Sequence, residues 1–286
     1  MKTDLKQKID WDICTESVIV NKTFDTGKKA ILRSDNNRLL GIVGKDYCPL
    51  SNSKFMEFTE ALTKSGEFEL KGFDEFNDGK THLAFLQNKN LNLKMNNCTM
   101  KEYLILGNSH DGTRPFYIGT GSSLTRCENQ FYSTIKVFRK KHTSPISMDQ
   151  FTIQDIIRTY KAKKNNIYAA FDGMESLRVD QNTINKLVKE IHKMLATDST
   201  VLKHDDYGWS PSMKLLRKSI EKEMSDLGNN AFGLFNGVTW YTSHEMRNAG
   251  SDFGRLTGTA NIINQKAFRF CNNLKRATYN ETILIG

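Results

Sequence analysis

The chain has 286 residues, and its 41 Lys and Arg against 32 Asp and Glu give a formal net charge of +9. Its length permits a sizeable core without disulfides or a structural metal. The five cysteines are scattered and odd in number, and no signal peptide or membrane-spanning run is visible, so we expect a cytoplasmic protein without membrane contacts.

The first third of the chain predicts short strands and one helix. Residues 1–16 are polar and predict a flexible N-terminal arm, and residues 17–20 are a short strand candidate. The apolar runs 29–33 and 38–43 flank a polar turn and predict a hairpin. We expect Ser53 to cap a helix that continues to about residue 64.

The middle of the chain predicts a meander of three antiparallel strands at residues 81–86, 101–107 and 115–124. The last two flank a polar segment with Asp111-Gly112, a strong turn signal. A helix is then predicted from about Cys127 to His142, because Phe131, Ile135 and Phe138 recur at helical spacing.

The last part of the chain predicts helices only. Apolar residues recur at helical spacing near residues 148–163, 180–196, 210–227, 232–247 and 256–277. Strands that precede helices predict the α+β class, with an antiparallel meander and hairpins packed against several α-helices. We expect a single domain over residues 17–286, strand-rich over 17–126 and helix-rich over 127–286.

Three central segments carry a family resemblance. They are Ser109-His110-Asp111-Gly112-Thr113, then Arg126-Cys127-Glu128-Asn129, then His142-Thr143. They resemble the signature of a large phage and plasmid family known as domain of unknown function 932. Two outer segments, 47–53 and 235–244, are also similar to that family, so the likeness covers roughly residues 30–270. It implies a phage or plasmid origin, and the host cytoplasm as location if a phage encodes the protein.

The signature histidine allows two interpretations. In the chemical one, His110 is a base or metal ligand that Asp111 orients, and Cys127 completes a hydrolase or nuclease site. In the structural one, Asp111-Gly112 makes a tight turn and Cys127 packs in the core. Residue spacing does not support a zinc site, and no glycine motif suits a nucleotide, so we predict neither metal nor cofactor.

Positive charge gathers in the centre of the chain. Residues 101–164 hold eleven Lys and Arg against five Asp and Glu. Cations interleaved with aromatic rings are typical of single-strand binding. The predicted nucleic-acid-binding residues are Arg114, Tyr117, Arg126, Tyr132, Lys136, Arg139, Lys140 and Lys141.

These observations favour a single-stranded DNA-binding protein that promotes strand annealing in recombination or replication. Strands followed by a helix are also similar in order to the ring-forming single-strand annealing proteins, which implies a homo-oligomer, as a ring or filament. The alternatives are the hydrolase or nuclease described above, and a non-enzymatic protein that binds a host factor.

Overall fold

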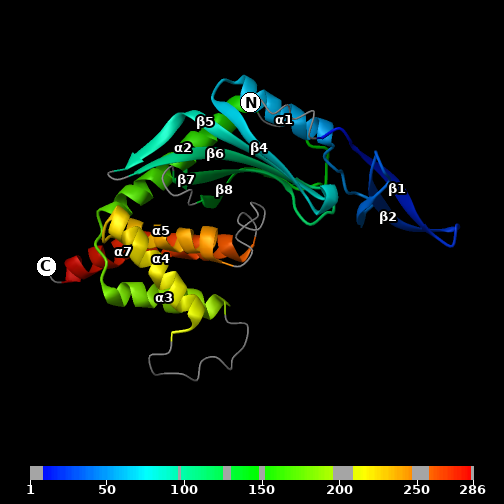
Figure 1. The fold of residues 1–286 in the computed structure, drawn as a ribbon. Coiled ribbons are helices and arrows are strands. Elements are labelled where there is room, and N and C mark those ends of the chain that lie inside the picture. Colours follow the sequence, from blue (N-terminus) through cyan, green and yellow to red (C-terminus); the bar gives the residue numbers. More distant parts are fainter. Residues whose placement is uncertain are drawn as a thin grey trace. The chain divides into compact units, whose positions relative to one another are not determined.

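The computed structural model describes residues 9–95, 98–124, 130–147, 152–195, 209–246 and 258–284, without the side chains of 91, 124, 130–136 and 275–284. It consists of antiparallel sheets and α-helices, which confirms the α+β class (Figure 1).

The first sheet has three strands in the order β1 (Ile13–Val20), β2 (Phe24–Arg33) and β3 (Leu39–Gly44). Both pairs are antiparallel, which confirms the predicted hairpin between β2 and β3. The chain enters this sheet through Ile9 and Trp11, which are 3% and 4% exposed. Within the expected arm of residues 1–16, these two apolar side chains therefore lie in the core.

The N-cap of helix α1 (Asn52–Lys64) lies two residues before the expected one. Ser51, and not Ser53, is the N-cap, and its hydroxyl accepts a hydrogen bond from the Lys54 amide at 3.2 Å. The carboxylate of Asp12 accepts a second one from the Asn52 amide at 2.9 Å. A negative charge at the start of the helix also interacts favourably with the positive end of the helix dipole. The helix start is thus tied to the segment that precedes β1.

The second sheet has five strands in the order β4 (Phe68–Phe76), β5 (Thr81–Met95), β6 (Cys98–Ser109), β7 (Phe116–Leu124) and β8 (Gln130–Lys140). It contains the three strands of the predicted meander; β5 and β6 are longer than predicted, and β7 matches its predicted range to within one residue. β4 and β8 form its two edges.

β8 contradicts the helix predicted from Cys127 to His142. Phe131, Ile135 and Phe138 do recur at helical spacing, but the segment is a strand beside β7. The ring of Phe138 lies 6.0 Å from that of Phe116 in the core. Aromatic and β-branched residues fill this segment and suit a pleated, half-buried surface, so the sheet edge overrides the helical spacing. The helix-rich part therefore begins at residue 153.

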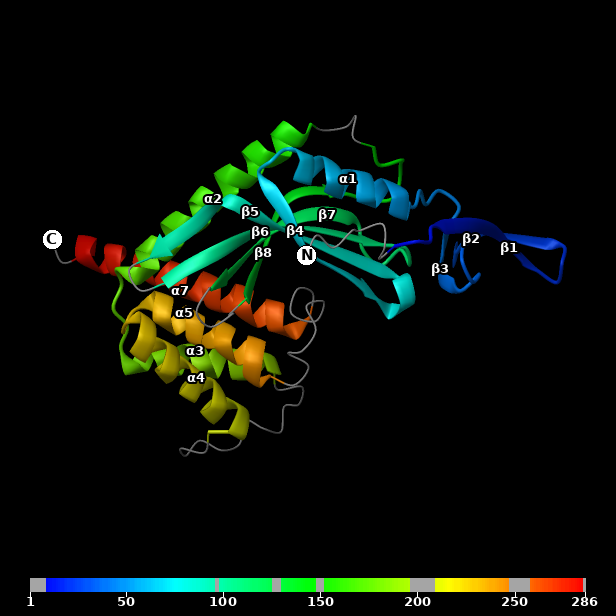
Figure 2. The ribbon, with the colours of Figure 1, turned by 45° about the horizontal axis from the view of Figure 1, so that its top comes forward.

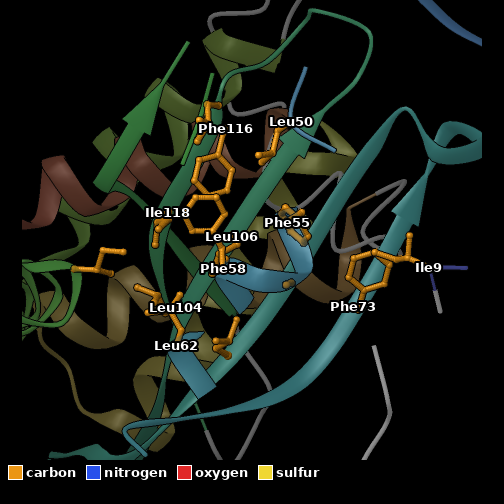
Figure 3. Packing of buried hydrophobic residues seen from close by; sticks show 14 of the residues in the cluster. Ile9, Leu50, Phe55, Phe58, Leu62, Phe73, Leu104, Leu106, Phe116 and Ile118 are labelled. Carbon is orange, nitrogen blue, oxygen red and sulfur yellow. The ribbon is translucent and has the colours of Figure 1, made fainter. Parts of the chain in front are cut away.

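The buried face of α1 covers one face of the five-stranded sheet. Phe55 and Phe58 are at most 1% exposed, and the Phe58 ring lies 5.1 Å from the ring of Phe116. Leu104 and Ile118 of the sheet belong to the same apolar cluster (Figure 3). Each buried side chain of this kind stabilises the fold by about 1.5–3 kcal/mol. The cluster therefore fixes the position of α1 and of its first residue, Asn52.

Among the residues that the structure describes, five α-helices follow the sheet: α2 (Ile153–Glu175), α3 (Gln181–Leu195), α4 (Pro211–Leu227), α5 (Ala231–Trp240) and α7 (Thr259–Leu284). α3 and α4 match their predicted boundaries closely. The predicted helix 232–247 is α5 followed by a π-helical turn, Tyr241–Glu245. None of the helices described is long and apolar enough to cross a membrane.

The chain divides into two compact units. The first holds residues 1–92, 101–121 and 134–163, and the second holds 93–100, 122–133 and 164–286. The first unit contains the three-stranded sheet, α1 and most of the five-stranded sheet, and the second contains α3 to α7. This division does not test whether the chain folds as one domain, so that expectation stays a prediction.

Trp11 offers a test of the anchored N-terminal segment. Its indole nitrogen donates to a Glu75 carboxylate oxygen at 3.1 Å, and the Arg33 guanidinium lies 3.9 Å from its ring. We expect Trp11→Ala to lower the free energy of unfolding by about 3–5 kcal/mol, measured by urea titration. Ile19→Ala is the control, because Ile19 is 55% exposed and should cost less than about 1 kcal/mol. Equal losses in both variants would contradict the anchoring role.

Candidate functional site

The turn between β6 and β7 carries the signature aspartate. One oxygen of Asp111 accepts hydrogen bonds from the Ser109 hydroxyl at 2.9 Å, the Thr113 amide at 3.0 Å and the Thr113 hydroxyl at 2.6 Å. Gly112 has a φ of 77°, a conformation that favours glycine. These contacts confirm the predicted hairpin turn and the local backbone hydrogen bond of Asp111.

β3 packs directly on this turn. A Cβ atom added to Gly41 would lie 2.7 Å from the Cα of Asp111, so only glycine permits the approach. The Tyr47 hydroxyl donates to the Ser109 carbonyl at 3.0 Å, and burial together with the Asp111 charge raises the pKa of Tyr47. The signature turn is thus held from two sides by the first sheet and the segment after it.

His110 lies away from Asp111, in the interior of the first unit. It is 0% exposed, and its Nε2 lies 2.9 Å from the side-chain oxygen of Asn52. The Asn52 amide nitrogen donates to the Trp11 carbonyl at 3.1 Å, which leaves its oxygen as the acceptor. His110 therefore carries its proton on Nε2 when neutral. One asparagine joins the signature histidine to the N-terminal segment.

The surroundings of His110 are mostly aromatic. The rings of His82 and Trp11 lie 5.2 and 6.0 Å from its own. Burial, then the neighbouring His82 and His142, lower its pKa, and Glu75 opposes them only in part. His110 Nδ1 has no hydrogen-bond partner among the described residues. A buried, neutral imidazole without a carboxylate partner suits a structural role better than that of a general base.

His142, from the third signature segment, contacts the residues that precede α1. Its Nδ1 lies 3.1 Å from the Cys48 carbonyl, and the Cys48 amide donates to the His142 carbonyl at 2.7 Å. Its ring lies 4.8 Å from that of Tyr47. Burial lowers its pKa, and hydrogen bonds to the backbone of Cys48 and Arg114 oppose this shift. Segments 47–52, 109–113 and 142 therefore meet in one buried polar cluster, which we call the motif cluster.

The motif cluster does not assemble the hydrolase constellation from the residues described. Asp111 binds its own turn while His110 binds Asn52, so the pair forms no dyad. Within the described ranges, no three His, Cys, Asp or Glu side chains group as a metal site. Cys127 lies outside the described residues, together with Arg126, Glu128 and Asn129 of the same segment.

The predicted binding residues fall at the end of β8 and next to the motif cluster. Arg139 and Lys141 are exposed and Lys140 is half-buried, on a strand end and not on the expected helix end. Among the residues with described side chains, no carboxylate pairs with any of these three. Arg126 lies outside the described residues, as do the side chains of Lys136 and Tyr132.

Arg114 and Tyr117 have different surroundings. The backbone amide of Arg114 donates to the Ser109 hydroxyl at 3.1 Å, and this hydroxyl donates to the Arg114 carbonyl at 3.3 Å. The Arg114 backbone also forms a hydrogen bond with His142. Arg114 therefore lies near the end of β8. The ring of Tyr117 covers Gly107, where an added Cβ would lie 2.3 Å from it, and burial raises the pKa of its phenol. Packing, and not base stacking, accounts for Tyr117.

The late motif segment 235–244 lies in the second unit and stabilises its helices. The Thr239 hydroxyl donates to the Asn236 carbonyl at 2.9 Å, and the Thr242 hydroxyl donates to Asn264 of α7 at 2.8 Å. The Lys222 ammonium lies 3.2 Å from the centre of the Trp240 ring. Buried polar side chains that are hydrogen-bonded in this way fix how helices pack.

Sequence reasoning missed Asn52, Trp11 and the buried Lys164. Lys164 is 0% exposed, its amine donates to the Ser122 hydroxyl at 2.9 Å, and burial lowers its pKa well below the ordinary value. The partners of these residues lie far away in the chain, so no local pattern marks them. The similarity of segment 47–53 to the family was the one signal that included Asn52.

The fold and the motif cluster define an α+β protein whose two signature histidines are buried and hydrogen-bonded. A family model described as a domain of unknown function (DUF932) matches residues 39–277, so the chain belongs to that family. Searches of curated proteins and of solved structures gave no match.

The two signature histidines predict a pH-dependent stability. Both have a lowered pKa in the folded chain, whereas an unfolded chain binds their protons near pH 6.5. Their contribution is therefore complete above about pH 6.5 and is lost as the pH falls, by up to about 1.4 kcal/mol per pH unit for each proton. Glu75, with a pKa of about 2, stays ionised in this range.

Urea unfolding between about pH 8 and pH 5 measures this dependence. We expect His110→Gln to reduce the slope of stability against pH by about one proton, whatever its effect on stability at neutral pH. A variant with the slope of the original protein would show that His110 does not titrate between the folded and unfolded states.

Proposed function

We propose that the protein binds single-stranded DNA through its phosphates and promotes annealing of complementary strands in a phage or plasmid context. The observation that carries the proposal is the run Arg139-Lys140-Lys141 at the end of β8. These three cations have no acidic partner among the side chains described, whereas other exposed cations, such as Arg158 and Lys64, do. Cations without their own counter-charges are free to neutralise phosphates and release counterions.

Rigid placement of this run supports the proposal. Phe138 before it packs against the core, and His142 after it is 4% exposed in the motif cluster. Arg114 lies near the same place through the contact of its backbone with His142. Pre-positioned cations lose little conformational freedom when a ligand binds. The motif cluster would then serve binding indirectly, by fixing the end of β8.

The mechanism needs neither metal nor cofactor. Phosphate contacts hold the strand without reading its sequence, and the bases stay exposed to search for a complement. Copies joined in a ring or filament would align their basic strand ends into a longer binding surface. The proposed location is the host cytoplasm. The likeness to annealing proteins contributes only the order of strands and helices, which is an analogy of fold.

Replacement of the run tests the proposal. We expect Arg139→Ala/Lys140→Ala/Lys141→Ala to weaken binding of single-stranded DNA to a similar degree for every sequence. Each lost phosphate contact should flatten the slope of log affinity against log salt by about 0.7. Fluorescence anisotropy with labelled oligonucleotides at several salt concentrations measures both quantities, and circular dichroism verifies the fold.

The matched control is Lys64→Ala/Arg158→Ala, which removes exposed cations that already pair with carboxylates. It should bind DNA like the original protein. Equal affinity and equal salt slope in the test variant and the original protein would refute the proposed contact. Addition of Mg²⁺ or Mn²⁺ to the same mixtures tests the nuclease alternative, since cleavage of the oligonucleotide would favour it over simple binding.

A further inference from the structure

The outer face of the three-stranded sheet is apolar and uncovered. Cross-strand partners share a face, so the register places Cys14 with Leu32, Leu32 with Leu39, and Ala30 with Ile42 on one side. Near the hairpin tip, beyond a register shift between Ser17 and Ile19, Val20 and Phe24 pair with each other and are also exposed. None of the seven apolar side chains in these pairs is buried: Cys14, Val20, Phe24, Ala30, Leu32, Leu39 and Ile42.

The exposure of this outer face is large for apolar residues. Phe24 is 66% exposed, Ile42 52%, Leu39 48% and Val20 47%, and they supply four of the six large exposed apolar side chains described. The β1–β2 hairpin extends away from the five-stranded sheet in both views (Figures 1 and 2). A contiguous apolar patch of this kind marks an interaction site more often than a chance surface.

Apolar residues lie on both faces of these strands, which indicates that a stable partner covers the outer face. Ile31 and Val43 are buried against the core, while their neighbours Ala30, Leu32 and Ile42 are on the outer face. The strands therefore lack the alternation of a sheet with one wet face. Continuous apolar runs are typical of strands buried on both faces.

The charges of the outer face fit a second copy of this chain. Glu16 lies in the row of Ala30 and Ile42, and Lys28 lies in the next row beside Gly44. Both are exposed, and neither has an ion-pair partner among the described side chains. A two-fold axis between these positions places Glu16 of each copy over Lys28 of the other, which gives two equivalent ion pairs within an apolar contact.

We propose that two copies of the protein associate through this outer face, about a two-fold axis that pairs Glu16 with Lys28. The inference adds a two-fold contact to the self-association in the proposed function, and it does not depend on DNA binding. Phosphates do not favour a surface with balanced charge and apolar side chains, so a protein is the occupant that this chemistry selects.

Light scattering after size exclusion, without DNA, tests the contact. We expect the original protein to have at least twice the 32.7 kDa mass of the chain, and Ile42→Glu to halve the measured mass. Thr15→Glu is the control, because Thr15 is exposed but pairs with the buried Ile31 on the opposite face. A monomeric original protein, or equal masses in the two folded variants, would overturn the proposal.

Charge exchange distinguishes a second copy from any other partner. Glu16→Lys and Lys28→Glu should each dissociate the pair, because like charges then face each other. The double variant should associate again, and so should an equimolar mixture of the two single variants. Failure of both to associate would overturn the two-fold arrangement. DNA affinity measured on the same variants is a separate result, so either proposal can fail without the other.

Discussion

The hydrogen bond between His110 and Asn52 is the contact on which the first unit depends. It joins residues 58 positions apart, and Asn52 extends the link to the Trp11 carbonyl. The N-terminal segment, the start of α1 and the β6–β7 turn are therefore positioned together. A buried polar chain of this kind is costly when any member is lost, because the remaining groups cannot reach water. This cost accounts for the burial of both Asn52 and His110.

The two sheets described expose different kinds of side chain to solvent. β8, at the edge of the five-stranded sheet, ends in Arg139, Lys140 and Lys141, and charge on an edge strand opposes pairing with the edge of another molecule. The three-stranded sheet instead exposes an apolar face. The described surface thus has a basic edge on one sheet and an apolar face on the other.

The sequence predicts those features that depend on residues close together in the chain. The Asp111 turn and the β2–β3 hairpin follow from residues next to each other, and α4 begins at Ser210, whose hydroxyl accepts a hydrogen bond from the Met213 amide. The segment of β8 fits a helix because Phe131, Ile135 and Phe138 recur at helical spacing, whereas its strand structure depends on pairing at the edge of the five-stranded sheet.

The motif cluster was only partly visible for the same reason. Family similarity marked the segments, but not that Asn52 bonds to His110 or that Tyr47 stacks on His142. Trp11 stands among polar residues, so its neighbourhood predicted an arm, whereas distant Glu75 and Arg33 hold it in place.

The buried Lys164 gives the second unit a chemical reporter of its own. Its amine is shielded from solvent, burial lowers its pKa, and it donates to the Ser122 hydroxyl. Reagents that acylate amines therefore reach it only when this region opens, while exposed lysines react at once. The rate at which Lys164 becomes acylated would measure how often the contact between α2 and β7 breaks in the folded protein.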